Sequence, residues 1–177
     1  MSYVLEALLV RGHDSWPAEI SERAGPAAGI YSDRRGTLML VPRLRTRVSR
    51  EATEALDQTD PVVLGFLELR RSDVELAEAA SMWGSVAYVH AEFQGGGFQA
   101  AVGWVGGQIA FGPRFTATSQ SEAEEDYYEV IPPPVRMAID EALAFLGVIA
   151  DDGMDEFDTV GLGRHRSSYQ WTEPDQH

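Results

Sequence analysis

The clearest group of residues that could do chemistry lies on one predicted strand, where Tyr88, His90 and Glu92 alternate with small apolar residues. Successive side chains of a strand point to opposite faces of a sheet, so these three are expected to form a row on one face. A histidine beside a carboxylate is a pairing that general acid–base catalysis uses. The row is also typical of a half-exposed hydrogen-bonding surface, which is the interpretation we favour.

The His-x-Glu spacing at 90–92 also occurs in zinc deaminases, which need paired cysteines further along the chain. The sequence contains no cysteine, so a site of that class is excluded. Another kind of metal site would need His13 or His165 to reach His90 from distant parts of the chain. We therefore predict no metal and no cofactor.

A second group lies near the C-terminus, in the segment DEFDTVGLGRHR at 155–166. Its glycines could expose backbone N–H groups beside two guanidiniums, which would suit an anion. The segment lacks the third glycine and the strand–turn–helix setting of a dinucleotide-binding motif. We favour arginines that pair with nearby carboxylates and fix this segment to the sheet. The alternative is protein or small-anion binding through Glu156, Asp158, Arg164, His165 and Arg166.

A third candidate is Trp104, which lies between two glycine turns, with Gln99 close to the first of them. Tryptophan is favoured at binding surfaces. A strand tryptophan flanked by valines is more typical of a core, and this is the interpretation we favour for Trp104.

Two charged segments complete the candidates. The stretch at 119–130 is acidic, and it is expected to be mobile or, alternatively, to dock a partner. Four arginines follow Pro42, three of them at alternate positions, and they could grip carboxylates or phosphates, although pairing within this acidic chain is favoured. The docking residues would be Glu122, Glu124, Glu125 and Asp126, and the arginines are Arg43, Arg45, Arg47 and Arg50.

Composition excludes several classes of protein. All 14 basic residues are arginine, so the lysine of Schiff-base, Walker A and protein-kinase chemistry is missing. The 28 acidic residues give a formal net charge of −14, which opposes nucleic-acid binding and an anionic membrane surface but would steer a basic protein partner. We find no membrane span and no signal peptide in the sequence, and we expect a cytoplasmic protein.

The elements that must position these residues are organised around the stretch from Gly84 to Pro113. Its alternating side chains and glycine turns predict a three-stranded antiparallel meander at about 85–112, with a short third strand that closes at Gly112-Pro113. Earlier, the pattern predicts a strand at 3–10 and a hairpin at 28–41. Predicted helices run from Ser15 to Gly25, from Ser49 to Asp57, from a capping box at Ser72-x-x-Glu75 to about Trp83, and from Val135 to Leu146. The segment at 61–69 fits a strand or a helix.

The fold class is therefore α+β, with one domain at 1–166 and a flexible tail at 167–177. We predict a mainly antiparallel sheet that is covered by helices on one side.

Two stretches resemble a pattern found in small uncharacterised proteins of actinobacteria. The first reads Tyr-Val-x-Ala-Glu-aromatic-x-Gly-Gly followed by Gln-x-Ala-x-x-Trp, and the second is the Glu-Phe-Asp-x-Val-Gly-Leu-Gly-Arg-His-Arg segment. The matching residues are Tyr88, Val89, Ala91, Glu92, Phe93, Gly95, Gly96, Gln99, Ala101, Trp104, Glu156, Phe157, Asp158, Gly161, Gly163, Arg164 and Arg166. The pattern carries no established activity, so the resemblance implies no reaction. In size and architecture the chain is similar to cytoplasmic immunity proteins of bacterial toxin systems.

These observations favour a non-enzymatic protein-interaction module, of the kind formed by acidic immunity proteins that inhibit a basic partner. The alternative is a small-anion or metal-dependent ligand-binding protein or enzyme that uses the groups at 88–92 and 164–166. That alternative requires His90 and Arg164 to converge in one pocket. A structural or oligomerising module is the third hypothesis.

Overall fold

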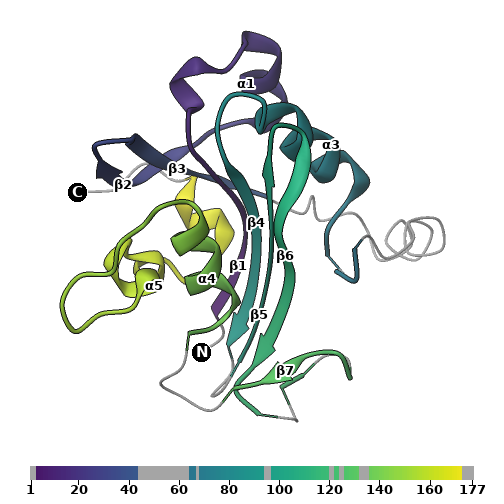
Figure 1. The fold of residues 1–177 in the computed structure, drawn as a ribbon, viewed down its shortest axis with the longest axis vertical. Helices are drawn as coiled ribbons and strands as arrows, with labels where there is room; N and C mark the ends of the chain where they lie inside the picture. The colour runs from purple at the N-terminus through teal and green to yellow at the C-terminus, as the bar shows by residue number, and fades with distance from the viewer. Residues whose placement is uncertain are drawn as a thin grey trace.

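The computed structural model describes residues 3–43, 64–66, 68–93, 97–119, 122–123, 126–131 and 136–172. Within these residues the chain forms one mixed sheet with helices packed against it (Figure 1). The described strands are β1 (Tyr3–Val10), β2 (Ala28–Asp33), β3 (Gly36–Pro42), β4 (Val86–Phe93), β5 (Phe98–Val105), β6 (Gln108–Ala117) and β7 (Glu129–Val130).

The order of the strands is β2-β3-β1-β4-β5-β6-β7, which puts β1 and β4 near the middle of the sheet. All neighbouring pairs are antiparallel except β6 and β7, which are parallel. The α+β class and the mainly antiparallel sheet are therefore confirmed. The predicted meander is β4, β5 and β6, and the predicted hairpin at 28–41 is β2 and β3.

The third strand of the meander is longer than the sequence predicted. It does not close at Gly112-Pro113 but continues to Ala117. Ala101 faces Arg114 and Gly103 faces Phe111, so the Gly-Pro pair forms a bulge opposite a single residue of β5. Proline is tolerated at a bulge because its missing N–H costs no ladder hydrogen bond there. A Cβ on Gly112 would stand 2.8 Å from the carbonyl oxygen of Ala101, so only glycine fits this bulge.

Helices cover both faces of the sheet, and the prediction of a single covered side is wrong (Figure 1). Helices α1 and α3 share a core with Leu8, Tyr88 and Trp104 on one face, called here the α3 side. Helix α4 and the C-terminal turns share a core with Leu9 and Val89 on the other face, called the α4 side. The described helices are α1 (Ala18–Ala24), α3 (Arg71–Ala80), α4 (Ala138–Phe145) and α5 (Glu156–Thr159), with short 3-10 turns η1 (His13–Ser15), η2 (Leu162–Arg164) and η3 (Ser168–Trp171).

The ends of the helices differ from the predicted ones. Ser15 belongs to η1, and α1 starts after Pro17. Helix α3 starts after Arg70, so Ser72 lies inside its first turn and the predicted capping box is wrong. A side chain inside the first turn cannot accept from the N–H groups that the preceding residue would cap.

Helix α4 buries the predicted apolar stripe and ends two residues before Gly147. Its buried apolar residues are Ala138, Ile139, Ala142 and Leu143, followed by Leu146. The described residues do not include Val135, the predicted helix at 49–57, the arginines at 45, 47 and 50, or residues 61–63 and 67. The described part of 61–69 belongs to neither a helix nor a named strand.

The chain packs against the sheet beyond residue 166, where the sequence placed the end of the domain. The backbone N–H of Val4 donates to the carbonyl of Arg166 across 2.9 Å, and Ser167 forms a β-bridge with Val4. Ser168 Oγ accepts from the Glu6 N–H at 2.7 Å and donates to the Glu6 carbonyl at 3.1 Å. β3 pairs with only the second half of β1. Residues 166–168 therefore supply hydrogen-bond partners for the backbone of the first half. Residues 166–172 therefore contribute to the fold.

Candidate functional site

The row on β4 lies on one face, as predicted, but it is not half-exposed. Tyr88 and His90 are buried on the α3 side, and only Glu92 is partly accessible. Tyr88 Oη donates to Oε1 of Glu6 at 3.2 Å, and Glu6 stands opposite His90 in the β1–β4 pairing. The ring of His90 packs edge-on against Phe98, with centroids 5.4 Å apart. The structure thus joins a third ionisable residue, Glu6, to Tyr88 and His90.

Glu6 was not among the residues predicted from the sequence. Its signal was a single acidic residue inside the apolar run from Tyr3 to Val10. A charged residue in such a run is almost never buried without a partner, so its isolation already pointed to a polar contact across the sheet.

The C-terminal candidates are held by contacts other than the predicted ones. Arg164 lies over the ring of Trp171, 5.2 Å from its centroid, and donates from Nε to the carbonyl of Gly161 at 3.2 Å. His165 packs edge-on against the same ring at 4.5 Å. Among the described residues, neither Arg164 nor Arg166 forms an ion pair with a carboxylate. The segment is fixed to the sheet, as expected, but by backbone and aromatic contacts.

The two acidic candidates of this segment have different surroundings. Glu156 is buried and forms an ion pair with Arg136, a partner that was not predicted from the sequence. Asp158 is exposed, and its backbone N–H donates to Oδ1 of Asp155 at 2.8 Å, which caps α5.

The structure does not bring His90 and Arg164 together. His90 lies on the α3 side of the sheet, whereas Arg164 lies over Trp171, which packs into the core on the α4 side. The sheet separates them, so the single pocket that the ligand-binding alternative requires is not formed by these two residues. In the described part of the chain, no group of three or more histidines, aspartates or glutamates could hold a metal ion.

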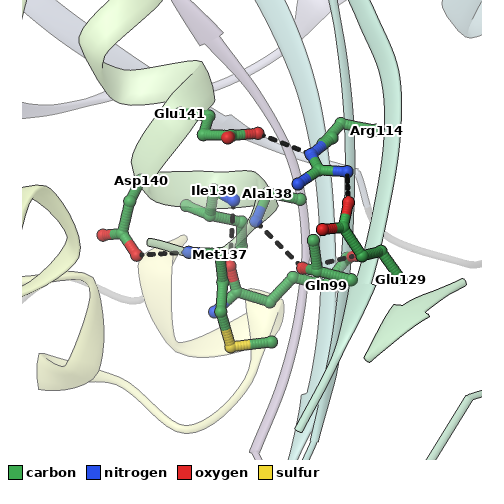
Figure 2. Close-up of polar contacts among 9 residues, drawn as sticks. Gln99, Arg114, Glu129, Met137, Ala138, Ile139, Asp140 and Glu141 are labelled. Carbon is green, nitrogen blue, oxygen red and sulfur yellow. Dashed lines mark hydrogen bonds and ion pairs between the residues drawn. The ribbon is translucent and has the colours of Figure 1, made fainter. Parts of the chain in front are cut away.

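Gln99 has a structural role at the start of α4 (Figure 2). Its Oε1 accepts from the backbone N–H of Ile139 at 2.9 Å, and Oγ1 of Thr116 accepts from the N–H of Ala138 at 3.0 Å. The first N–H groups of a helix have no partner within the helix. Two strand side chains therefore cap α4 and hold it against the sheet.

Close packing of α4 also depends on a residue without a side chain. A Cβ on Gly103 would stand 2.5 Å from a ring carbon of Phe145. The ring of Phe145 lies over Gly103 and stacks on Phe111, with centroids 5.5 Å apart. Gly103 therefore allows the last turn of α4 to approach β5.

Charged groups surround the same helix (Figure 2). Arg114 donates from Nε to Glu141 at 2.7 Å and forms a second ion pair with Glu129. The hydrogen bond to Glu129, with that to Glu141, raises the pKa of Arg114 although burial opposes this. Asp140 is buried, and burial raises its pKa with help from the charges of Asp155 and Glu156.

Trp104 is fully buried on the α3 side and belongs to the core, as favoured from its sequence context. Arg43 pairs with the buried Asp73 at 2.7 Å, so pairing within the chain is confirmed for this arginine. In the acidic stretch, Glu124 and Glu125 lie outside the described residues. Glu122 is partly accessible and Asp126 is exposed.

The carboxylates between α4 and α5 are the largest group of exposed acidic residues in one described loop. Asp151, Asp152 and Asp155 are exposed in this loop, Asp158 is exposed in α5, and none of the four forms an ion pair with a described residue.

No family model matches this sequence, and neither a curated protein nor a solved structure matches it. No helix among the described residues is long and apolar enough to cross a membrane.

Proposed function

We propose that this chain is a non-enzymatic interaction protein that binds a basic protein partner in the cytoplasm, as an inhibitor of the immunity type. The observation that carries the proposal is the net charge of −14, which attracts a basic protein over a distance. Exposed carboxylates such as Asp151, Asp152 and Asp155 have no cationic partner among the described residues and contribute to this long-range attraction. Such an excess of negative potential accelerates encounter with a basic protein and opposes binding to nucleic acid.

The internal contacts of the polar candidates support this proposal over the ligand-binding alternative. Gln99 caps α4, Glu156 pairs with Arg136, and Tyr88 bonds to Glu6. Each of these side chains already has a partner within the fold. A binding residue must offer an atom to its ligand, and releasing a buried polar contact for this purpose is costly.

The experiment is a pull-down from a lysate of the protein's own host, with the full chain immobilised. We expect a basic protein to be retained at about 50 mM salt and released at about 500 mM, because salt screens contacts between exposed charges. The control is an unrelated acidic protein of similar size and net charge. If every basic protein retained by this chain is also retained by the control, the proposal is wrong.

A further inference from the structure

Three large apolar side chains are exposed at the end of the sheet where α3 stops. The exposed fractions are 66% for Met82, 48% for Trp83 and 44% for Ile109. Met82 and Trp83 follow the last turn of α3, whereas Ile109 follows the turn between β5 and β6 and pairs with Trp104. These three residues are called the end patch. Exposed apolar groups that gather at one place mark interaction sites on soluble proteins.

The two segments of the end patch are tied together. The N–H of Gly106 donates to the Ser81 carbonyl at 2.9 Å, and the N–H of Gly107 donates to Ser81 Oγ at 2.8 Å. Met82 Sδ lies 3.4 Å from the position that a Cβ on Gly107 would take. The patch is therefore formed before any partner arrives, which lowers the ordering cost of binding.

The charges around the end patch are negative. Glu75 and Glu78 are exposed on α3, one turn apart, and Glu78 belongs to the turn that contacts Gly107. Asp14 is exposed in η1. It lies two residues after Gly12, and Gly12 packs against the carbonyl of Trp83. No arginine occurs between Ser72 and Gly84 or between Phe98 and Pro113. The end patch thus combines an apolar centre with an acidic rim.

We propose that the end patch is the docking surface for the basic protein partner, an inference that rests on the proposed function. Met82 and Trp83 enter an apolar depression of the partner, and Glu75 and Glu78 meet lysines or arginines around it. Methionine and tryptophan are enriched in the cores of interfaces, and tryptophan is among the commonest binding hot spots. A second copy of this chain is disfavoured as the occupant because it would bring two acidic rims together.

The first test removes the apolar contacts. The double variant Met82→Ser/Trp83→Ser is compared with Ile149→Ser/Met154→Ser, which removes two exposed apolar side chains from the loop between α4 and α5. Binding of the partner captured by the wild-type chain is measured by titration. We expect the first variant to lose about tenfold or more in affinity and the second to lose less than about twofold. Ile109→Thr is a milder third variant, expected to lose affinity several-fold without perturbing α3.

The second test locates the contact directly. A photo-reactive benzoylphenylalanine replaces Met82 in one variant and Met154 in the other, and the cross-linked peptides are identified by mass spectrometry. We expect cross-links from position 82 to a partner peptide that contains lysine or arginine. Cross-links from position 154 in place of position 82 would overturn the inference.

The third test separates contact from long-range charge. Two double variants are compared, Glu75→Gln/Glu78→Gln and Asp151→Asn/Asp152→Asn. Each removes two negative charges, so the long-range attraction of a basic partner falls equally in both. We expect the first pair to weaken binding several-fold more than the second.

The outcomes distinguish the two proposals. Binding to a basic partner could survive Met82→Ser/Trp83→Ser and Ile109→Thr but be lost in Ile149→Ser/Met154→Ser. In that case the inference that the partner docks at the end patch is wrong, and the proposed function stands. If the wild-type chain retains no basic protein that the acidic control protein lacks, both are wrong.

Discussion

The side chain of Arg11 donates a hydrogen bond from Nε to the backbone carbonyl of Leu146 across 3.0 Å. The same guanidinium donates to both carboxylate oxygens of Asp33, at 3.1 and 2.9 Å, and to the carbonyl of Gly36 at 2.8 Å. The last carbonyls of a helix lack partners within the helix. One buried arginine at the end of β1 therefore caps α4 and fixes the β2–β3 turn beside it.

Replacing this arginine is expected to destabilise the fold strongly. In Arg11→Met the carbonyls of Leu146 and Gly36 lose their donor, and we expect a loss of about 3 kcal/mol in the free energy of unfolding. Urea denaturation measures the loss. Arg34→Met is the control, because Arg34 is exposed in the same turn. A loss below about 1 kcal/mol for Arg11→Met would contradict this role.

The Arg11 prediction has a pH dependence with a definite sign. Burial acts to raise the pKa of Asp33, but hydrogen bonds from the Arg35 N–H and the Arg11 guanidinium outweigh it and lower this pKa. A lowered pKa in the folded state gives stability that is present above the unfolded value of about 4 and is lost as pH falls. The difference between wild type and Arg11→Met should therefore shrink in acid.

The meander was predictable because its signals are local. Alternation at 86–93 and glycines at 106–107 define strands and a turn without any knowledge of the rest of the chain. The extension of β6 was not predictable, because Gly112-Pro113 reads as a stop unless the bulge opposite β5 is known. The second covered face was missed because Tyr88 and His90 look polar, although a strand in the middle of a sheet can bury them with a partner.

In the candidate site, too, local features were predictable from the sequence and contacts between distant residues were not. The common face of Tyr88 and His90 follows from the strand period and was predicted. The contacts of Arg11 with Leu146, of Gln99 with Ile139 and of Glu6 with Tyr88 join residues far apart in sequence. Residue types and spacing do not identify such partners, so polar residues that stabilise helix ends were interpreted as candidates for binding.

Gln99 offers a direct test of its structural role. Gln99→Leu keeps the approximate volume but leaves the buried N–H of Ile139 without an acceptor, and we expect a loss of about 1–3 kcal/mol in stability. Thr116→Val should have a similar cost, because it removes the acceptor for the N–H of Ala138. In the double variant the losses should not add, since both acceptors hold the same helix end.

Thermal and urea unfolding measure these losses. Gln108→Leu is the matched control, because Gln108 is exposed at the start of β6. If Gln99→Leu is as stable as Gln108→Leu, the cap contributes nothing and Gln99 is again a candidate for ligand binding.

Asp140 is expected to give a pH dependence opposite to that of Asp33. Burial raises its pKa most, and the charges of Asp155 and Glu156 add to this, while hydrogen bonds from the N–H groups of Phe157 and Met137 oppose it. A raised pKa in the folded state gives stability that is fully present below the unfolded value of about 4 and is lost as pH rises through the folded value. Wild type should therefore lose stability relative to Asp140→Asn between about pH 4 and neutrality.

Urea unfolding across this pH range measures the effect. Asp140→Ala is the control, because it also lacks the titrating group but removes both acceptors. It should be less stable than Asp140→Asn throughout and give the same pH-dependent difference from wild type. An advantage of wild type over both variants that grows with pH would show that the sign is wrong.

The C-terminal segment gives a test of where the domain ends. A chain ending at Arg166 loses both hydrogen bonds between Ser168 and Glu6 and the buried ring of Trp171. We expect it to be less stable than the full chain by about 3 kcal/mol or more, which is the usual cost of removing a buried aromatic side chain. A chain ending at Thr172 keeps these contacts and is expected to match the full chain in thermal unfolding.

Two point variants separate the contributions within the full chain. Trp171→Ala should account for most of the loss, because it also removes the ring on which Arg164 and His165 pack. Ser168→Ala should cost about 1–3 kcal/mol, because the buried N–H of Glu6 is left without its acceptor, whereas the Glu6 carbonyl keeps the N–H of Arg43. Equal stability of the chains ending at 166 and 172 would instead favour a flexible tail from residue 167, and the contacts between Ser168 and Glu6 would then contribute nothing to folding.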